Sequence, residues 1–156
     1  MLNSRLKSTK FLNMAIASGM AVFFLLDRFL KYAALSLKSE ETVPLISNFF
    51  SFRFTANYKI AFSLPLEGAW LSYVIFVILL ILIFQLAKKV VRKNLDCEAI
   101  ALGAIILGAS SNLIDRLIYG YVIDYFEITY FTVFNLADVL ISAGAIYLIV
   151  KALLKK

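Results

Sequence analysis

The side chains that could do chemistry gather in one stretch, residues 107–141, of an otherwise apolar sequence. Inside or beside two apolar segments, this stretch places Asn112, Asp115, Arg116, Asp124, Asn135 and Asp138. A charged side chain facing lipid at the centre of a bilayer would cost roughly 2.5 to 3.5 kcal/mol. Polar residues within such segments therefore face the protein interior, where by default they mark a functional site.

Asp124 and Asp138 differ from Asp27 and Asp115, because neither has a basic residue within one helical turn in the sequence. Two carboxyl groups a few ångströms apart cannot both ionise, so one keeps a proton and the pair holds an acid and a base together. Such a pair can activate water for peptide hydrolysis, as in an aspartic protease. The spacing alone leaves open that the two aspartates are structural or ion-pathway groups.

The remaining polar residues are spaced to support such a pair. Asn112, Asp115 and Arg116 share one face of a helix, and Asn135 with Asp138 share a face of the next one. We expect Arg116 to pair with Asp115 and so to hold its helix to the segment that follows.

A second supporting pair precedes this stretch. Asp27 and Lys31 are four residues apart, and we expect them to pair with each other or to reach Asp115 and Arg116.

Composition limits the classes of protein to which the chain can belong. It has 156 residues, enough for one domain, and 62% of them are hydrophobic, against about 45–50% in soluble domains. The net charge of +6 comes from Lys and Arg that flank apolar runs, which favours membrane orientation over nucleic-acid binding. With no His and one Cys, the commonest metal ligand and general base are missing, and we expect no metal and no cofactor.

The elements that must position these residues can be read from the apolar runs. We expect a single integral membrane domain over 1–156: a bundle of four transmembrane helices with a small extended or β platform on its outer, periplasmic or extracellular, face. Alternation of Phe50, Phe52 and Phe54 with polar residues predicts a strand in the platform. Tyrosines of the aromatic link at 118–132, Tyr125 among them, are expected at the membrane interface. The predicted helices span about 11–37, 69–87, 97–117 and 133–154, and the platform spans about 42–66.

Basic residues set the expected orientation. They cluster in the N-terminal tail, between the second and third helices, and at the C-terminal end, which predicts that both termini are cytoplasmic. At about 1.5 Å of rise per residue, Asp27, Asn112 and Asp138 then all lie in the outer third of the bilayer, with Asp124 just above them. We therefore expect one polar constellation near the outer face.

Five short motifs resemble those of the signal peptidase II (lipoprotein signal peptidase) family. They are N-L-I-D-R from Asn112, G-Y-V-I-D-Y from Gly120, F-N-L-A-D from Phe134, Asp27 with Lys31, and Asn57 with A-F-S-L from Ala61. The resemblance implies a multi-pass aspartyl endopeptidase of the bacterial cytoplasmic (inner) membrane. Such an enzyme removes the signal peptide from diacylglyceryl-modified prolipoproteins before the lipidated cysteine.

Carried over by position, the resemblance makes Asp124 and Asp138 the catalytic pair. Residues that bind substrate or support the site would be Asp27, Lys31, Asn57, Asn112, Asp115, Arg116, Asn135 and Ala137. The implied partners are the prolipoprotein and membrane lipids, with no nucleic acid, and the protein is expected to be a monomer.

Two positions depart from the family pattern. Lys59 and Ser111 stand where the family tends to have glycine, which bears on substrate preference and efficiency. Two alternatives remain at this point: a non-cleaving relative that binds lipidated peptides or inhibitors, and a small membrane transporter subunit.

Overall fold

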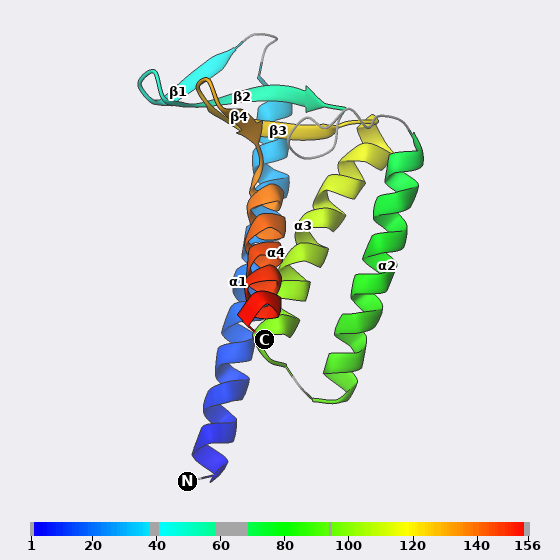
Figure 1. The fold of residues 1–156 in the computed structure, drawn as a ribbon. Coiled ribbons are helices and arrows are strands. Elements are labelled where there is room, and N and C mark those ends of the chain that lie inside the picture. The colour runs from blue at the N-terminus through cyan, green and yellow to red at the C-terminus, as the bar shows by residue number, and fades with distance from the viewer. Residues whose placement is uncertain (1, 38–40, 59–68, 94, 155–156) are drawn as a thin grey trace.

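The computed structural model describes residues 2–37, 41–58, 69–93 and 95–154 of the chain. Within these ranges, helices stand side by side and a sheet lies across one end of them (Figure 1). In chain order the elements are α1 (Leu2–Leu35), β1 (Thr42–Ile46), β2 (Phe50–Asn57), α2 (Ala69–Val91), α3 (Cys97–Tyr119), β3 (Val122–Ile128), β4 (Thr132–Phe134) and α4 (Leu136–Leu154).

Three helices in the described part of the chain are long and apolar enough to cross a membrane. They are Trp70–Val91, Cys97–Tyr119 and Leu136–Leu154. The expected first span, 11–37, is helical almost throughout as part of α1, but α1 is not one of these three. Its last turns carry the charged residues Asp27, Arg28 and Lys31, which make that end of the helix polar. A helical membrane protein with a small sheet is confirmed.

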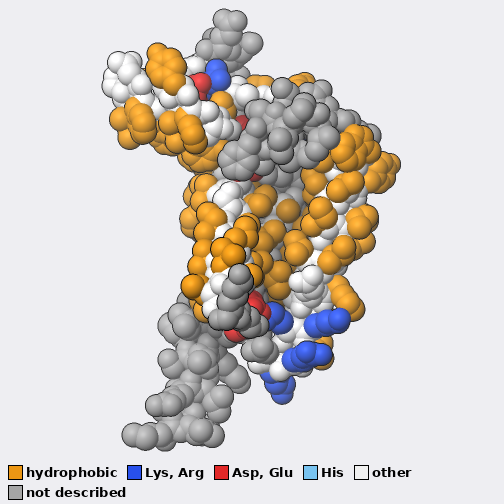
Figure 2. Space-filling view, viewed as in Figure 1, with side chains coloured by type: hydrophobic (Ala, Val, Ile, Leu, Met, Phe, Trp, Pro, Cys, Tyr) orange, Lys and Arg blue, Asp and Glu red, His pale blue; other side chains and the backbone are white. Residues whose placement is uncertain are grey.

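The outer surface of the bundle fits this assignment. Figure 2 shows apolar side chains covering the visible faces of α2 and α4, while Lys and Arg gather at the end of α2 farthest from the sheet. Apolar surface of this kind is stable against lipid, and basic side chains are stable at the membrane–water boundary.

The sheet is antiparallel, with strand order β1-β2-β3-β4. The strand predicted from Phe50, Phe52 and Phe54 is confirmed as β2, whereas the expected link at 118–132 contains strand β3 and ends at the first residue of β4. Residues 122–125 of β3 are all buried, so this strand shows no alternation between apolar and polar positions that would reveal it in the sequence. Residues 59–66 of the expected platform, Lys59 included, lie outside the described residues.

The fourth helix begins at Leu136, three residues later than predicted. Val133 and Phe134 pair with β3, where Phe134 lies opposite Phe126. Asn135 then lies between the end of β4 and the start of α4. Pairing within the sheet therefore takes residues whose apolar character had suggested a longer helix.

Small residues let α3 and α4 approach closely. A Cβ atom at Gly108 would overlap the carbonyl oxygen of Ala137 and lie 2.9 Å from Ile141 Cγ1. A Cβ atom at Gly144 would lie 2.6 Å from the carbonyl oxygen of Ala101. Only glycine allows these backbones to come so near, and the Gly108 contact fixes the start of α4 against α3.

Candidate active site

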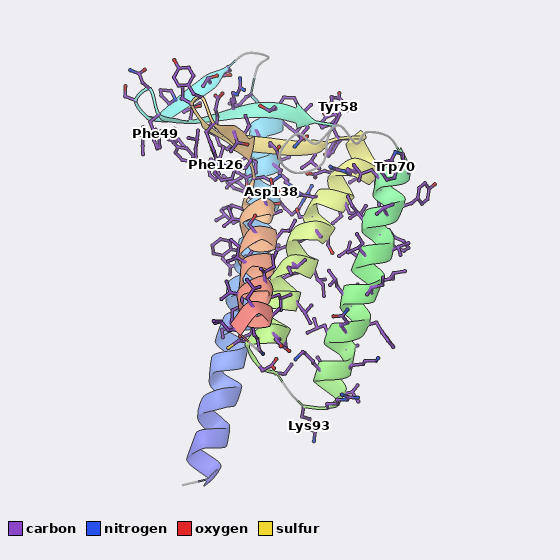
Figure 3. All side chains as sticks on the ribbon, in the orientation of Figure 1. Phe49, Tyr58, Trp70, Lys93, Phe126 and Asp138 are labelled. Atoms are coloured by element: carbon purple, nitrogen blue, oxygen red, sulfur yellow. The ribbon has the colours of Figure 1, made fainter. Side chains whose placement is uncertain are left out.

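The predicted polar residues meet where the helices reach the sheet. Figure 3 places Asp138 near the top of α4, directly beneath the sheet. Asp124 lies in the middle of β3, and the polar residues of α1 and α3 come to the same level. The expectation of one constellation, drawn from the helical rise, is confirmed by the contacts described below.

Asp138 is held in place by hydrogen bonds at the start of α4. The Asn135 side chain accepts a hydrogen bond from Asp138 N at 2.9 Å, and Asp138 Oδ2 accepts one from Asn135 N at 3.3 Å. This reciprocal arrangement is a capping box, with an Asn and an Asp in the two roles. Because both side chains satisfy backbone groups of the first turn, the carboxyl group of Asp138 has a fixed position.

Other elements satisfy the remaining N–H groups at the start of this helix. Leu136 N donates to the hydroxyl of Tyr125 at 2.9 Å, and Ala137 N donates to Asp27 Oδ1 at 3.2 Å. Ala137 itself is buried. The start of α4 is therefore attached to both β3 and α1 by hydrogen bonds to buried side chains.

Two asparagines link the carboxyl groups of Asp124 and Asp138. Asn135 Nδ2 donates to Asp124 Oδ1 at 2.6 Å, while the backbone N of the same residue reaches Asp138. Asn112 Nδ2 donates to Asp138 Oδ1 at 2.8 Å, and Asn112 Oδ1 accepts from Asn135 Nδ2 at 3.2 Å. From β2, Asn57 Nδ2 donates to Asp124 Oδ2 at 2.8 Å. Both carboxyl groups therefore lie in one connected hydrogen-bond network.

Asp124 has an unusual proton affinity for an aspartate. It is 2% exposed, and this burial, followed by the charge of Asp138, raises the pKa of its carboxyl group to about 7. Hydrogen bonds from Asn57 and Asn135 and the charge of Lys31 oppose the rise but do not cancel it. Asp124 can therefore carry a proton at pH values where an exposed aspartate has lost it.

Beneath this pair lies a buried cluster of charges. Lys31 Nζ is 2.7 Å from Asp115 Oδ2, 3.2 Å from Asp27 Oδ2 and 2.7 Å from Asn112 Oδ1. Lys31, Asp27 and Asp115 are all fully buried. The expected pairing of Lys31 with Asp27 is confirmed, and the contact with Asn112 joins the charge cluster to the network around Asp138.

The expected pairing of Asp115 with Arg116 is corrected. Among the described residues, the cations paired with Asp115 are Lys31 and Arg28, whose Nη1 lies 2.6 Å from Asp115 Oδ1. Asp115 Oδ2 also accepts from Ile123 N, so this residue does hold α3 to the segment that follows. Arg116 instead lies where the charges of Asp124, Asp138 and Asp115 act on it.

Three residues of the site were not predicted as such from the sequence. Arg28 was visible only as one of several charges near Asp27. Ser111 was noted for its departure from glycine, and its hydroxyl donates to Asp27 Oδ2 at 2.5 Å. Tyr125 was expected at the membrane interface but is fully buried, and its hydroxyl donates to Asp27 Oδ1 at 2.9 Å. The one sign of this role in the sequence was the position of Tyr125 directly after Asp124.

Comparison with known proteins gives one consistent result. Residues 19–154 match the family model described as signal peptidase (SPase) II. The lipoprotein signal peptidase of Clostridium acetobutylicum is 35% identical over 86% of this chain and 91% of its own length, and that of Haemophilus ducreyi is 36% identical over 86% and 88%. A solved bacterial membrane enzyme aligns with a TM-score of 0.73 at 25% identity over 92% of this chain and 88% of its own.

Proposed function

The chain belongs to the signal peptidase II family, and we propose that it is the aspartyl endopeptidase that removes signal peptides from bacterial prolipoproteins. Its substrate carries a diacylglyceryl group on the cysteine that follows the cleaved bond. Asp124 and Asp138 are the catalytic residues, and the reaction uses neither a metal nor a cofactor.

The observation that carries this proposal is the connection between the two carboxyl groups through Asn135. Its side chain binds Asp124 at 2.6 Å and its backbone binds Asp138 at 3.3 Å, so one residue holds both acids. The pair also lies at the boundary between the apolar helices and the sheet. A peptide whose cysteine is anchored in lipid by acyl chains would present its scissile bond at this depth.

Formal charges support a single shared proton. Asp27 and Asp115 are balanced by Lys31 and Arg28 within the buried cluster. The catalytic pair is then left with the positive charge of Arg116. One proton on the pair gives it a charge of −1, which Arg116 balances, whereas two ionised carboxylates would leave a buried excess of negative charge.

The environments of the two acids support different roles for them. Asp138 sits in the first turn of α4, where the N-terminal end of the helix dipole and hydrogen bonds from Asn112 and Asn135 stabilise a carboxylate and offset part of the cost of burying it. The pKa of Asp124 is raised to about 7, which favours the acid form. Asp138 is therefore the base in the resting pair and Asp124 the acid.

The reaction follows from these roles. Asp138 takes a proton from water as the water oxygen attacks the scissile carbonyl carbon, and Asp124 gives its proton to the carbonyl oxygen. In the tetrahedral intermediate, Asp138 passes its proton to the leaving nitrogen as the C–N bond breaks, and Asp124 recovers a proton from the hydroxyl that becomes the new carboxyl group. The pair ends in its starting protonation state.

Charge placement supports the topology proposed for the enzyme. The end of α2, the start of α1 and the end of α4 all point away from the sheet (Figure 1). Four basic residues lie in the last turn of α2 or directly after it: Lys88, Lys89, Arg92 and Lys93. By the positive-inside rule that end is cytoplasmic, α1 completes a four-helix transmembrane bundle, and the catalytic pair works near the outer face of the inner membrane. The enzyme acts as a monomer in contact with membrane lipids.

A cleavage assay on two matched substrates tests the proposal. Purified full-length protein is incubated with a prolipoprotein that carries the diacylglyceryl group and with the same prolipoprotein lacking it. The lipidated substrate should be cut, with product masses placing the cleavage directly before the modified cysteine. Binding of the lipidated substrate without any cleavage would instead identify the non-cleaving relative, and neither binding nor cleavage would leave a transporter subunit as the better explanation.

A further inference from the structure

The hydroxyl group of Tyr125 joins three elements of the site. It donates to Asp27 Oδ1 of α1 at 2.9 Å and accepts from Leu136 N, the first residue of α4, at 2.9 Å. Tyr125 itself follows Asp124 in β3, and Leu136 precedes Asp138 by two residues. One buried oxygen atom thus lies between the strand that carries one acid and the helix that carries the other.

The position of this oxygen atom is well fixed. Tyr125 is fully buried, and its ring packs against Phe126 at 4.8 Å and Phe52 at 5.6 Å between ring centroids. Burial also raises the pKa of the Tyr125 hydroxyl far above its usual value, so it keeps its proton and donates at every working pH. A fixed ring and a permanent donor make this group suited to holding other groups in place.

We propose that Tyr125 is a positioning residue for the Asp124–Asp138 pair, whose hydroxyl sets the start of α4 against β3. The inference rests on the function proposed above. Without the hydroxyl, Leu136 N has lost its buried acceptor and Asp27 has lost one of its donors. The first turn of α4 then relaxes or admits water, and the separation of the two carboxyl groups changes.

The variant Tyr125→Phe isolates this role, because it keeps the ring and removes only the oxygen atom. Tyr130→Phe is the matched control, since Tyr130 lies in the same sheet region, in the turn between β3 and β4, with a fully exposed side chain. We expect Tyr125→Phe to lower kcat on the lipidated prolipoprotein by about tenfold or more, because small displacements of reacting groups cost this much. KM should change less than kcat, and Tyr130→Phe should match the wild type.

A titration gives a readout that a purely structural role would not move. The charged and polar groups acting on Asp124 are Asn57 from β2, Lys31 from α1, Arg116 from α3, and Asn135 and Asp138 at the start of α4. Tyr125→Phe acts directly on the last of these elements through Leu136 N, and it removes one donor from Asp27, the partner of Lys31. If Asp138 moves away or water enters, both effects lower the pKa of Asp124 from about 7 toward its usual value.

The titration is followed by 13C NMR of the aspartate carboxyl groups in full-length protein in detergent, with Asp124→Asn used to identify the Asp124 signal. A fall in the pKa of Asp124 in Tyr125→Phe, with kcat per folded molecule reduced, supports the proposal. An unchanged pKa, or a loss of activity that only follows the loss of folded protein, overturns it. Failure of the proposed function would appear separately, as a wild type that does not cleave, and the titration would still decide the role of Tyr125.

Discussion

Substitution of Gly108 by Ala tests whether the close contact between α3 and α4 positions the catalytic pair. An added Cβ atom would lie 2.9 Å from Ile141 Cγ1, where ordinary contact begins at 3.4 Å, and would overlap the carbonyl oxygen of Ala137 more severely. The start of α4 must therefore move by at least about half an ångström. Because Asp138 is the next residue after Ala137, this displacement reaches the reacting groups directly.

The expected magnitudes can be worked from that contact. Overpacking against backbone costs about 1–3 kcal/mol, and Ala in place of Gly within a helix returns about 1 kcal/mol. The net loss of about 0–2 kcal/mol should lower the melting temperature in detergent by up to roughly 8 °C. Cleavage should fall about tenfold or more, since displacements near 1 Å can cost a factor of about 100.

Two matched variants separate an effect on the stability of the protein from an effect on the position of Asp138. Gly144→Ala places a Cβ atom 2.6 Å from Ala101 O, which is a similarly close contact. This contact lies six residues, or about 9 Å along the helix, from Asp138. Gly144→Ala should lower the melting temperature, but it should reduce cleavage per folded molecule less than Gly108→Ala does. Gly103→Ala meets only the flexible end of Met20 at 3.4 Å and should be tolerated or slightly stabilising. A Gly108→Ala enzyme with unchanged melting temperature and rate would refute the reasoning.

Three further predictions concern charge. The rate of cleavage should fall as pH rises through about 7, where the Asp124 pKa lies, because loss of the shared proton leaves the pair without an acid; a rate unchanged up to pH 9 would contradict this. The pKa of Asp124 is higher in the folded than in the unfolded state, so the folded protein loses stability as pH rises from about 4 to 7. The loss is up to about 4 kcal/mol over roughly three pKa units. Asp124→Asn should therefore have a higher melting temperature than the wild type at pH 8 but not at pH 4. Lys31→Met leaves buried Asp27 without its cation and Asp115 with Arg28 alone, and should cost about 3–5 kcal/mol in thermal unfolding, whereas Lys151→Met, from a partly exposed pair with Glu98, should leave the melting temperature almost unchanged.

The sequence was sufficient to predict that Asp27, Asn112, Asp124 and Asp138 meet. Helical rise is nearly constant, so residue counts along apolar helices translate directly into depth in a membrane. Once the basic residues set the direction of each helix, only one arrangement brought these polar groups to a common level. Such an argument needs no knowledge of side-chain contacts.

Contacts between distant segments could not be predicted in the same way. Asp115 pairs with Arg28, 87 residues earlier, and helical spacing favoured its neighbour Arg116 instead. Strand β3 escaped detection because residues 122–125 are all buried, so apolar and polar positions do not alternate along it. Tyr125 looked like one interfacial aromatic among several, since nothing in the sequence shows that the start of α4 needs a buried acceptor there.

The central claim is that Asp124 and Asp138 act together as acid and base. It is tested most directly by the rate of prolipoprotein cleavage in Asp124→Asn and Asp138→Asn, beside Asp96→Asn as a control. Asp96 caps α3 at the opposite end of the bundle, and Asn serves equally well as a cap. Each of the first two substitutions should reduce the rate at least about 10³-fold while Asp96→Asn keeps the wild-type rate. Near-normal cleavage by either Asp124→Asn or Asp138→Asn would contradict the account.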